Sequence, residues 1–205
     1  MNKKKGLFIS FEGPEASGKS SQILLLQKYL TTKKISFITT REPGGTKLAE
    51  SLRNLILKIK SDINIDEEIL MLMAARSHHI NNVIKPALDK GILVISDRFA
   101  DSTFVYQGYV NNFGIQKAKS LHKNILNNFL PHKTFLFNLS SSKIIARLKK
   151  RKSKNKYDKL ERNFHDQVNR GYEIISKNKR FIKIDASKSI TYINKKIINA
   201  INLLI

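Results

Sequence analysis

Eight consecutive residues near the start of the sequence have the types and the spacing of a phosphate-binding loop. Residues 13–20 read GPEASGKS and match the pattern G-x-x-x-x-G-K-[ST] in full. Glycine lets such a loop curl so that its backbone N–H groups point at a phosphate, at the positive end of the following helix. The Lys19 ammonium would reach the terminal phosphates, and the Ser20 hydroxyl would bind Mg²⁺. The residues expected to bind the nucleoside triphosphate are Gly13, Pro14, Glu15, Ala16, Ser17, Gly18, Lys19, Ser20 and Ser21.

An acid and a base follow one of the apolar segments. Asp97 and Arg98 come directly after ILVIS at residues 92–96. Ligands of open α/β sheets gather at the carboxyl ends of the strands. Asp97 would bind Mg²⁺ directly or through water, and the planar guanidinium of Arg98 would bind a phosphate. Standing alone, such a pair is more often a structural ion pair, but beside a phosphate-binding loop a functional role is favoured.

Short apolar segments alternate with longer segments of helical periodicity. We predict five strands, at residues 7–11, 35–40, 92–95, 134–139 and 181–184. Helices are predicted over residues 20–32 and 47–58, from residue 66 onward, and in a closing segment around residues 190–201. Strands separated by helices imply a parallel sheet that is covered on both faces. We therefore expect a single three-layer α/β domain over residues 1–205.

The composition bounds the class of protein. The chain has 205 residues, 41% of them hydrophobic, which is enough for one substantial core. No apolar run approaches the roughly 18 residues of a membrane span, and the apolar stretch at residues 7–11 is too short for a signal-peptide core. The absence of cysteine excludes a disulfide framework and a thiolate metal site. These features predict a cytoplasmic protein without a membrane partner.

The net charge of +22 raises the question of a nucleic-acid partner. Lys and Arg total 38, against 16 acidic residues. Such an excess supports non-specific binding to nucleic acid. Net charge alone, however, indicates solubility and non-specific binding rather than a particular function. We favour the interpretation that most of these lysines lie on solvated faces. A local excess between residues 143 and 162 stands out.

Further blocks of sequence occur in an order that is typical of one enzyme family. REPGGT occupies residues 41–46, DRFADST residues 97–103 and YQG residues 106–108. The remaining blocks are FEGPEASGKS at 11–20, AAR at 74–76, DKLE at 158–161, FH at 164–165, GY at 171–172 and IDA at 184–186. With these blocks the sequence resembles the bacterial thymidylate kinases over nearly the whole chain.

The resemblance implies a fold, a reaction and an assembly. It implies a P-loop NTPase fold with a five-stranded parallel sheet and a short lid at residues 147–163. The protein would transfer the γ-phosphoryl group of ATP to dTMP, with Mg²⁺ as cofactor, giving dTDP and ADP, and it would form a homodimer. Such a transfer depends on positioning and on neutralising charge, so the key groups should be cations and backbone N–H groups.

The resemblance also implies how the sugar and the phosphate of dTMP are bound. Glu15 would accept a hydrogen bond from the deoxyribose 3′-hydroxyl group. Arg98, Arg41 and Arg53 would bind the phosphate, although a solvated helix position is the alternative for Arg53. Tyr106 would lie under the sugar and leave little room for a 2′-hydroxyl group.

The thymine base would be recognised by a second group of residues. Arg76 would read the edge of the base together with Gln107 and with Ser102 or Thr103. The family has an aromatic ring on the base four positions before this arginine, and here that position is Leu72. The expected dTMP-binding residues are Glu15, Arg41, Pro43, Arg53, Leu72, Arg76, Arg98, Ser102, Thr103, Tyr106 and Gln107.

The lid is implied to carry a transition-state cation. Thymidylate kinases carry the basic residue that supplies the catalytic cation either in the phosphate-binding loop or in the lid. The variable loop positions here are not basic. Arg147 and Arg151 match the lid type, and their i, i+4 spacing would put both on one face of a helix. The Asp-Arg-x-Glu motif of the family has Lys159 as its second residue here. The expected catalytic residues are Lys19, Arg98, Arg151, Arg147 and Glu15.

Two alternative functions remain open from the sequence. The first is a P-loop kinase for another nucleotide or nucleoside acceptor. The second, from a different class, is a basic P-loop ATPase that acts on nucleic acid. The specific motifs converge on a small-molecule pocket, which favours a kinase without a specific nucleic-acid partner.

Overall fold

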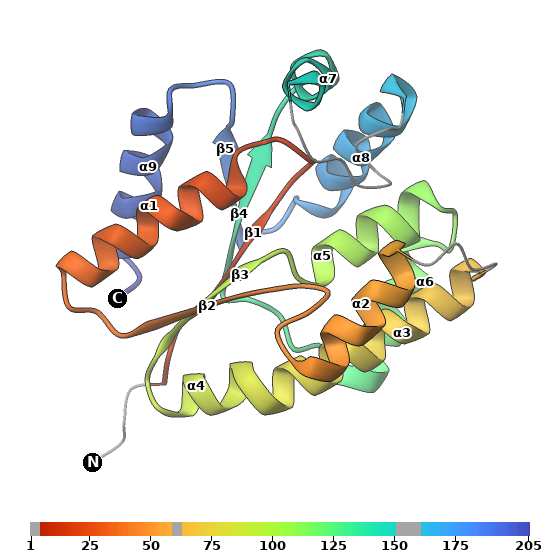
Figure 1. Ribbon diagram of the computed structural model, residues 1–205, viewed down its shortest axis with the longest axis horizontal. Helices are drawn as coiled ribbons and strands as arrows, with labels where there is room; N and C mark the ends of the chain where they lie inside the picture. The colour runs from red at the N-terminus through yellow and green to blue at the C-terminus, as the bar shows by residue number, and fades with distance from the viewer. Residues whose placement is uncertain (1–4, 59–62, 151–160) are drawn as a thin grey trace.

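A computed structural model describes residues 5–58, 63–150 and 161–205 of the chain. Its centre is a parallel sheet whose five strands lie in the order β2-β3-β1-β4-β5 (Figure 1). The strands are β1 (Phe8–Glu12), β2 (Phe37–Arg41), β3 (Leu93–Asp97), β4 (Lys133–Asn138) and β5 (Phe181–Asp185). Each predicted strand is present with its ends within two residues of the prediction, and the predicted three-layer α/β fold is confirmed.

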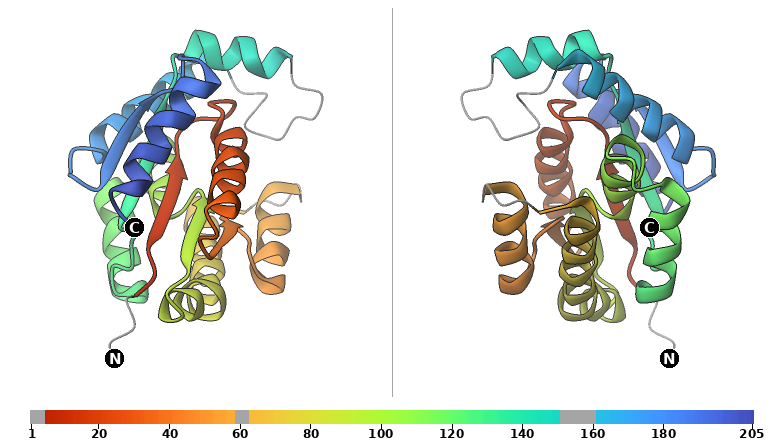
Figure 2. Two further views of the ribbon diagram at one scale, coloured as in Figure 1. Left: turned by 90° about the vertical axis from the view of Figure 1, so that its left-hand side faces the viewer. Right: turned by 90° about the vertical axis from the view of Figure 1, so that its right-hand side faces the viewer.

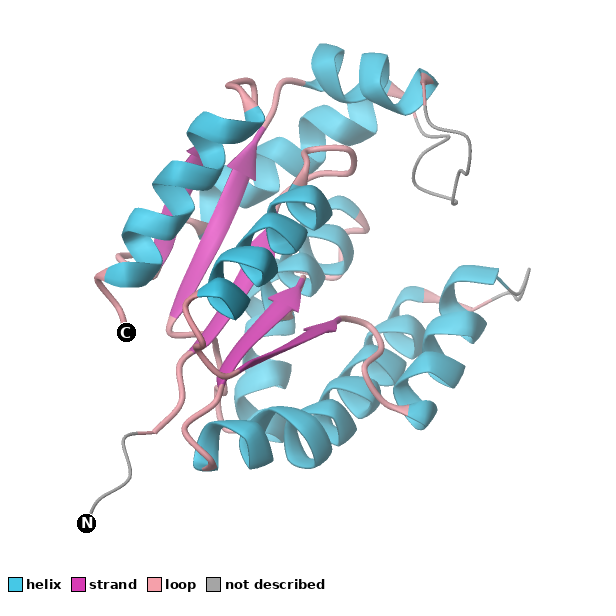
Figure 3. Ribbon diagram, turned by 60° about the vertical axis from the view of Figure 1, so that its left-hand side comes forward, coloured by secondary structure: helices cyan, strands magenta, loops and turns pink. Residues whose placement is uncertain are grey.

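Helices cover both faces of the sheet (Figure 3). On one face lie α1 (Lys19–Thr32) and α9 (Ile190–Asn202), with α7 (Ser141–Lys149) beyond the carboxyl ends of the strands (Figure 2). The other helices are α2 (Lys47–Lys58), α3 (Ile65–His79), η1 (Ile80–Ile84), α4 (Lys85–Asp89), α5 (Ala100–Thr103), η2 (Phe104–Val110), α6 (Ile115–Leu126) and α8 (Arg162–Ile175). None of the described helices is long and apolar enough to cross a membrane.

Side chains that alternate in direction along the strands form two hydrophobic cores, one on each side of the sheet. Ile9 and Phe11 pack with Leu26 of α1 and Ile197 of α9. Phe8, from the same strand, instead joins the cluster that contains α3, η2, α6 and α8. Because side chains in a strand point alternately to opposite faces, Glu12 shares the face of Phe8. An acid is thereby placed beneath the helices that carry the candidate site.

Two glycines permit close approaches that shape the site. Gly13 has φ 131°, and a Cβ there would collide with the carbonyl oxygen of Phe137 on the neighbouring strand. A Cβ at Gly171 would lie 2.9 Å from Val105 Cγ1. Glycine at position 171 therefore lets α8 pack directly against η2, where the rings of Tyr172 and Tyr106 make an edge-on contact with centroids 6.5 Å apart.

Candidate functional site

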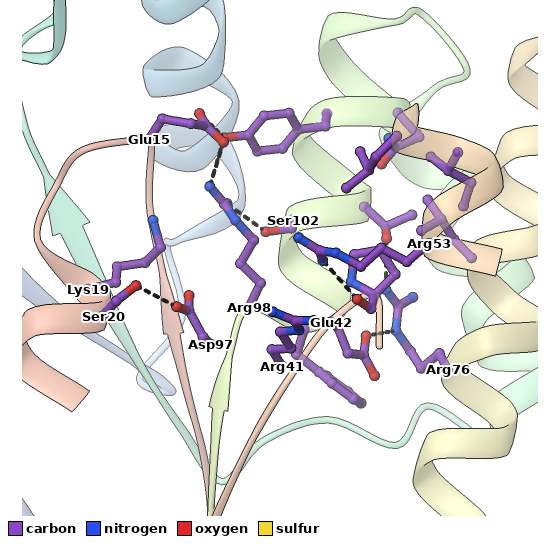
Figure 4. A pocket seen from close by; sticks show the side chains of 18 of the residues that line it. Glu15, Lys19, Ser20, Arg41, Glu42, Arg53, Arg76, Asp97, Arg98 and Ser102 are labelled. Carbon is purple, nitrogen blue, oxygen red and sulfur yellow. Dashed lines mark hydrogen bonds and ion pairs between the residues drawn. The ribbon is translucent and has the colours of Figure 1, made fainter. Parts of the chain in front are cut away.

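A cavity of about 550 Å³ opens at the carboxyl edge of the sheet, beyond β1, β2 and β3. The phosphate-binding loop from Glu15 onward and every residue expected to bind dTMP line it. Figure 4 shows Lys19, Ser20 and Asp97 on one side of the cavity, Arg76 on the other, and Arg98 between them. This edge is the position at which open α/β sheets bind ligands.

The phosphate-binding loop wraps around the ammonium group of its own lysine. Lys19 Nζ donates to the carbonyl oxygens of Gly13 at 3.0 Å and Pro14 at 2.8 Å. Burial and the nearby charge of Arg98 lower the pKa of Lys19 to about 8. An ammonium in so poorly solvated a place is stabilised strongly by an anion, so a phosphate group would bind here in preference to water.

Ser20 and Asp97 meet on the same side of the cavity. Ser20 Oγ donates to Asp97 Oδ2 at 2.9 Å, which joins the start of α1 to the end of β3. Both side chains offer oxygen, the donor that Mg²⁺ prefers, and Mg²⁺ is usually held by one or two protein groups together with substrate phosphates and water. This pair therefore fits a magnesium ion shared with a nucleotide.

Arg98 is the hub of the cavity. It has φ 70°, and its side chain is only 18% exposed. Its Nη2 contacts Glu15 Oε1 at 2.7 Å, and Nη1 donates to Ser102 Oγ at 3.0 Å and to Tyr172 at 3.2 Å. Tyr106 completes the arrangement by donating to the other oxygen of Glu15 at 2.8 Å. Burial raises the pKa of Glu15, but Arg98 and Lys19 outweigh it, and the pKa lies below its usual value.

Glu12 supports this hub from below, and sequence reasoning did not single it out. One oxygen accepts from Phe99 N at 2.7 Å, and the other accepts from Ser102 Oγ at 2.7 Å and from the Tyr172 hydroxyl at 2.8 Å. Burial and the charge of Asp101 raise the pKa of Glu12 to about 7. The signal in the sequence was an acid at the end of a buried strand, just before the glycine-rich loop.

Arg76 is fixed by a buried network on the far side of the cavity. Its Nε donates to Glu42 Oε2 at 2.6 Å, and its Nη2 donates to Thr103 Oγ1 at 2.8 Å. His79 Nδ1 lies 3.0 Å from the second oxygen of Glu42, and His79 Nε2 lies 2.7 Å from Thr40 Oγ1. Burial raises the pKa of Glu42, but Arg76 and His79 outweigh it and keep the pKa low. Glu42 and His79 were not predicted to hold Arg76.

The other two predicted phosphate ligands lie at the rim. Arg41 pairs with Glu50, with Nη2 2.9 Å from Oε2, and its side chain is 57% exposed. Arg53 donates from Nη1 to the carbonyl oxygen of Pro43 at 2.8 Å. Both guanidinium groups line the cavity with N–H groups to spare. They fit the role of rim cations that bind an entering phosphate.

One group of residues that line the cavity suits a base. Gln107 donates from Nε2 to Glu68 Oε1 at 2.7 Å, and Leu72 is 5% exposed. Phe99 and Tyr106 are the aromatic side chains among the described lining residues, and Arg76 lies over the Phe99 ring at 5.3 Å. Glu68 also lines the cavity and contacts Gln107, and it was not predicted as a site residue.

Of the two arginines predicted in the lid, the structure describes Arg147. Arg147 reaches the phosphate-binding loop from α7: Nη1 donates to Ala16 O at 3.1 Å, and Nη2 donates to Ala186 O at 3.0 Å. Arg151 and Lys159 lie outside the described residues, as does most of the predicted lid. Arg147 is thus a cation held at the loop and outside the lining of the cavity.

The chain is similar to known proteins over nearly its whole length. The family model described as thymidylate kinase matches residues 11–197. The thymidylate kinase of Mycoplasma capricolum is 41% identical over 200 residues, which cover 95% of this chain and 94% of that protein. Those of Ruthia magnifica (41% identity, 91% and 93% covered) and Carboxydothermus hydrogenoformans (40%, 90% and 91%) are similarly related. The family match spans every residue that lines the cavity.

Proposed function

This chain belongs to the thymidylate kinase family and phosphorylates dTMP to dTDP at the expense of ATP, and we propose that the cavity at the carboxyl edge of its sheet is where this transfer occurs. The observation that carries the proposal is that one cavity is lined by the phosphate-binding loop from Glu15 onward, by a set of arginines, and by the residues predicted to bind the base. The distribution of side chains gives each substrate its place.

The acceptor dTMP would lie across the middle of the cavity. Its phosphate would bind Arg98, which Glu12, Ser102 and Tyr172 hold in place, with Arg41 and Arg53 at the rim. Arginine suits this role because its planar fork matches phosphate oxygens in pairs. The sugar would lie against Tyr106, within reach of Glu15, and the base would point toward Arg76 and Gln107.

The donor ATP would bind with its phosphates on the loop. Backbone N–H groups of residues 13–20 and the start of α1 would face the β- and γ-phosphates. We propose Ser20 and Asp97 as the protein ligands of Mg²⁺, which when bound would neutralise charge on these phosphates. Lys19 would exchange its two carbonyl contacts for the γ-phosphate.

The chemistry then requires alignment and charge neutralisation. An oxygen of the dTMP phosphate forms a bond to the γ-phosphorus while the bond to the β–γ bridging oxygen breaks, and ADP leaves. Lys19 and Arg98 would approach the transferred group from the donor and acceptor sides. Preorganised cations are effective here because they stabilise charge without having to reorganise.

An ADP-release assay across dTMP, dUMP, UMP, CMP and AMP with ATP and Mg²⁺ tests the proposal. We expect dTMP to give the highest kcat/KM. A preference for another monophosphate would support the alternative of a P-loop kinase for a different acceptor.

The net charge of +22 predicts nucleic-acid binding that is weak, salt-dependent and without effect on ATP turnover. Stimulation of ATP hydrolysis by DNA or RNA without dTMP would instead support a nucleic-acid ATPase.

The first prediction concerns the lid-type cations. We expect Arg151→Ala to lower kcat at least about a hundredfold with little change in the KM for dTMP, because the lost cation acts mainly in the transition state. Arg147→Ala should cause a smaller loss, since its guanidinium already binds two carbonyl groups. Steady-state kinetics of both variants, with the exposed Lys143→Ala as control, provide the measurement. Wild-type kcat in both arginine variants would mean that the catalytic cation lies elsewhere.

The second prediction concerns the missing aromatic ring. Leu72→Phe should tighten dTMP binding up to about tenfold and leave ATP binding unchanged, because a flat ring would stack on the base with about 0.5–1.5 kcal/mol beyond area burial. Phe104 does not substitute for it, since its ring packs against His122 at 5.6 Å. Calorimetric titration with dTMP measures the effect, and the same substitution at the exposed Leu203, Leu203→Phe, is the control. Unchanged or weaker binding would mean that the pocket has closed around leucine.

A homodimer and a cytoplasmic location complete the proposal. Leu48 and Leu55 on α2 and Leu70 on α3 are 47%, 39% and 55% exposed, and a second copy would cover such side chains from water. Equilibrium sedimentation of the purified protein tests the assembly, and cell fractionation tests the location.

A further inference from the structure

The carboxamide of Gln107 is held in one orientation by a carboxylate. Gln107 lies on η2 and is 5% exposed, while Glu68 lies in α3 and is 9% exposed. The contact joins Gln107 Nε2 to Glu68 Oε1 at 2.7 Å. An ionised carboxylate accepts hydrogen bonds and has none to donate. Glu68 therefore binds the NH₂ end of the carboxamide and disfavours the flipped orientation.

The opposite end of the same carboxamide is a free acceptor in the cavity. Within the described residues Gln107 Oε1 forms no hydrogen bond, and it is not among the enclosed polar atoms that lack a partner. Because Gln107 lines the cavity and this oxygen is not enclosed, we expect the oxygen to face the cavity. Its lone pairs are available to an N–H group of a ligand.

A hydrogen-bond donor lines the same cavity as this acceptor. Arg76 lies on α3 two turns after Glu68 and also lines the cavity, and its guanidinium carries N–H groups only, of which Glu42 and Thr103 engage two through short contacts. Thymine and uracil present an N3–H donor next to the O4 acceptor. Cytosine presents the reverse, an N4 amino donor next to an N3 acceptor. An acceptor beside a donor on the protein therefore matches thymine or uracil and opposes cytosine.

We propose that Glu68 is a specificity-determining residue that acts through Gln107: it keeps the Gln107 carbonyl oxygen facing the base, so that the cavity accepts N3–H pyrimidines and rejects cytosine nucleotides. The inference rests on the proposed function, since it takes the part of the cavity lined by Leu72, Arg76 and Gln107 as the base site. Glu68 itself is a positioning residue and need not touch the substrate.

The test compares two substrates that differ only at the base edge in question. The kcat/KM values for dUMP and dCMP are measured with wild-type enzyme and with Glu68→Gln, whose carboxamide can donate as well as accept. Gln107 is then free to flip, and we expect the dUMP/dCMP ratio to fall about tenfold, the scale of one exchanged hydrogen bond. Asp66→Asn is the matched control because it removes one acidic charge from the exposed start of the same helix, and it should keep the ratio.

A double-variant cycle separates action through Gln107 from a general disturbance. Gln107→Met removes the carboxamide, and in that background Glu68→Gln should no longer change the ratio. If Glu68→Gln fails to fold, as judged by thermal denaturation, Glu68→Met frees Gln107 without adding a buried polar group and should lower the ratio in the same way.

The possible results separate a failure of the role of Glu68 from a failure of the proposed function. An unchanged dUMP/dCMP ratio in the folded Glu68 variant overturns the inference while wild-type turnover of dTMP upholds the proposed function. An equal change in the Gln107→Met background also overturns it. Wild-type enzyme that turns over none of these pyrimidine nucleotides overturns both.

Discussion

Replacing Lys19 with alanine should lower kcat at least about a thousandfold and leave the fold intact. The loss of one preorganised group that stabilises transition-state charge costs about a hundred- to a thousandfold in other enzymes, and Lys19 carries a full charge toward the transferred phosphoryl group. Its removal leaves the carbonyl oxygens of Gly13 and Pro14 without their ammonium donor. Because Lys19 lines the cavity, water can enter the space that its side chain would leave, so the effect on stability should be modest.

Coupled ADP-release kinetics with dTMP measure this loss, and thermal denaturation checks the fold. Lys28→Ala is the matched control, because Lys28 lies on the same helix, carries the same charge and is exposed. Near-normal turnover in Lys19→Ala would show that the phosphate-binding loop is not the site of transfer. Reduced turnover in the control would point instead to the loss of net charge.

Replacing Arg98 with alanine should lower kcat/KM for dTMP by a similar factor, with little change in the KM for ATP. The variant removes the cation between the two substrates, and it also leaves Glu15 without its ion-pair partner. Truncating one member of a buried pair costs about 3–5 kcal/mol. The pair is partly solvated, with 18% and 9% of the side chains exposed, so we expect the loss of stability to fall below that range.

Arg98→Lys separates charge from geometry. Lysine restores the positive charge but not the fork that contacts Glu15, Ser102 and Tyr172 together. Turnover should therefore recover only in part, whereas Arg170→Ala on the exposed side of α8 should behave as wild type. If Arg98→Ala kept its kcat/KM for dTMP, the acceptor phosphate would have to bind at Arg41 and Arg53 alone.

Local patterns were sufficient to predict the fold and the phosphate-binding loop. Apolar runs separated by helical periods require a parallel sheet, because two-sided burial of the strands needs helices on both faces. The loop could be identified from residues 13–20 because its chemistry depends on neighbouring backbone groups and on one lysine and one serine within a single turn. Asp97 could be placed beside it because strands of a parallel sheet end at the same edge.

The partners of each site residue were decided only by the tertiary structure. Glu12 and Tyr172 are 160 residues apart in sequence yet share a hydrogen bond, and Glu42 meets Arg76 across 34 residues. Such contacts depend on how α3, η2 and α8 pack over the sheet, which periodicity leaves open. The sequence by itself determined which groups are available for phosphoryl transfer. Packing decided which carboxylate orients which arginine or amide, because a buried polar group must find its partner wherever the fold brings one.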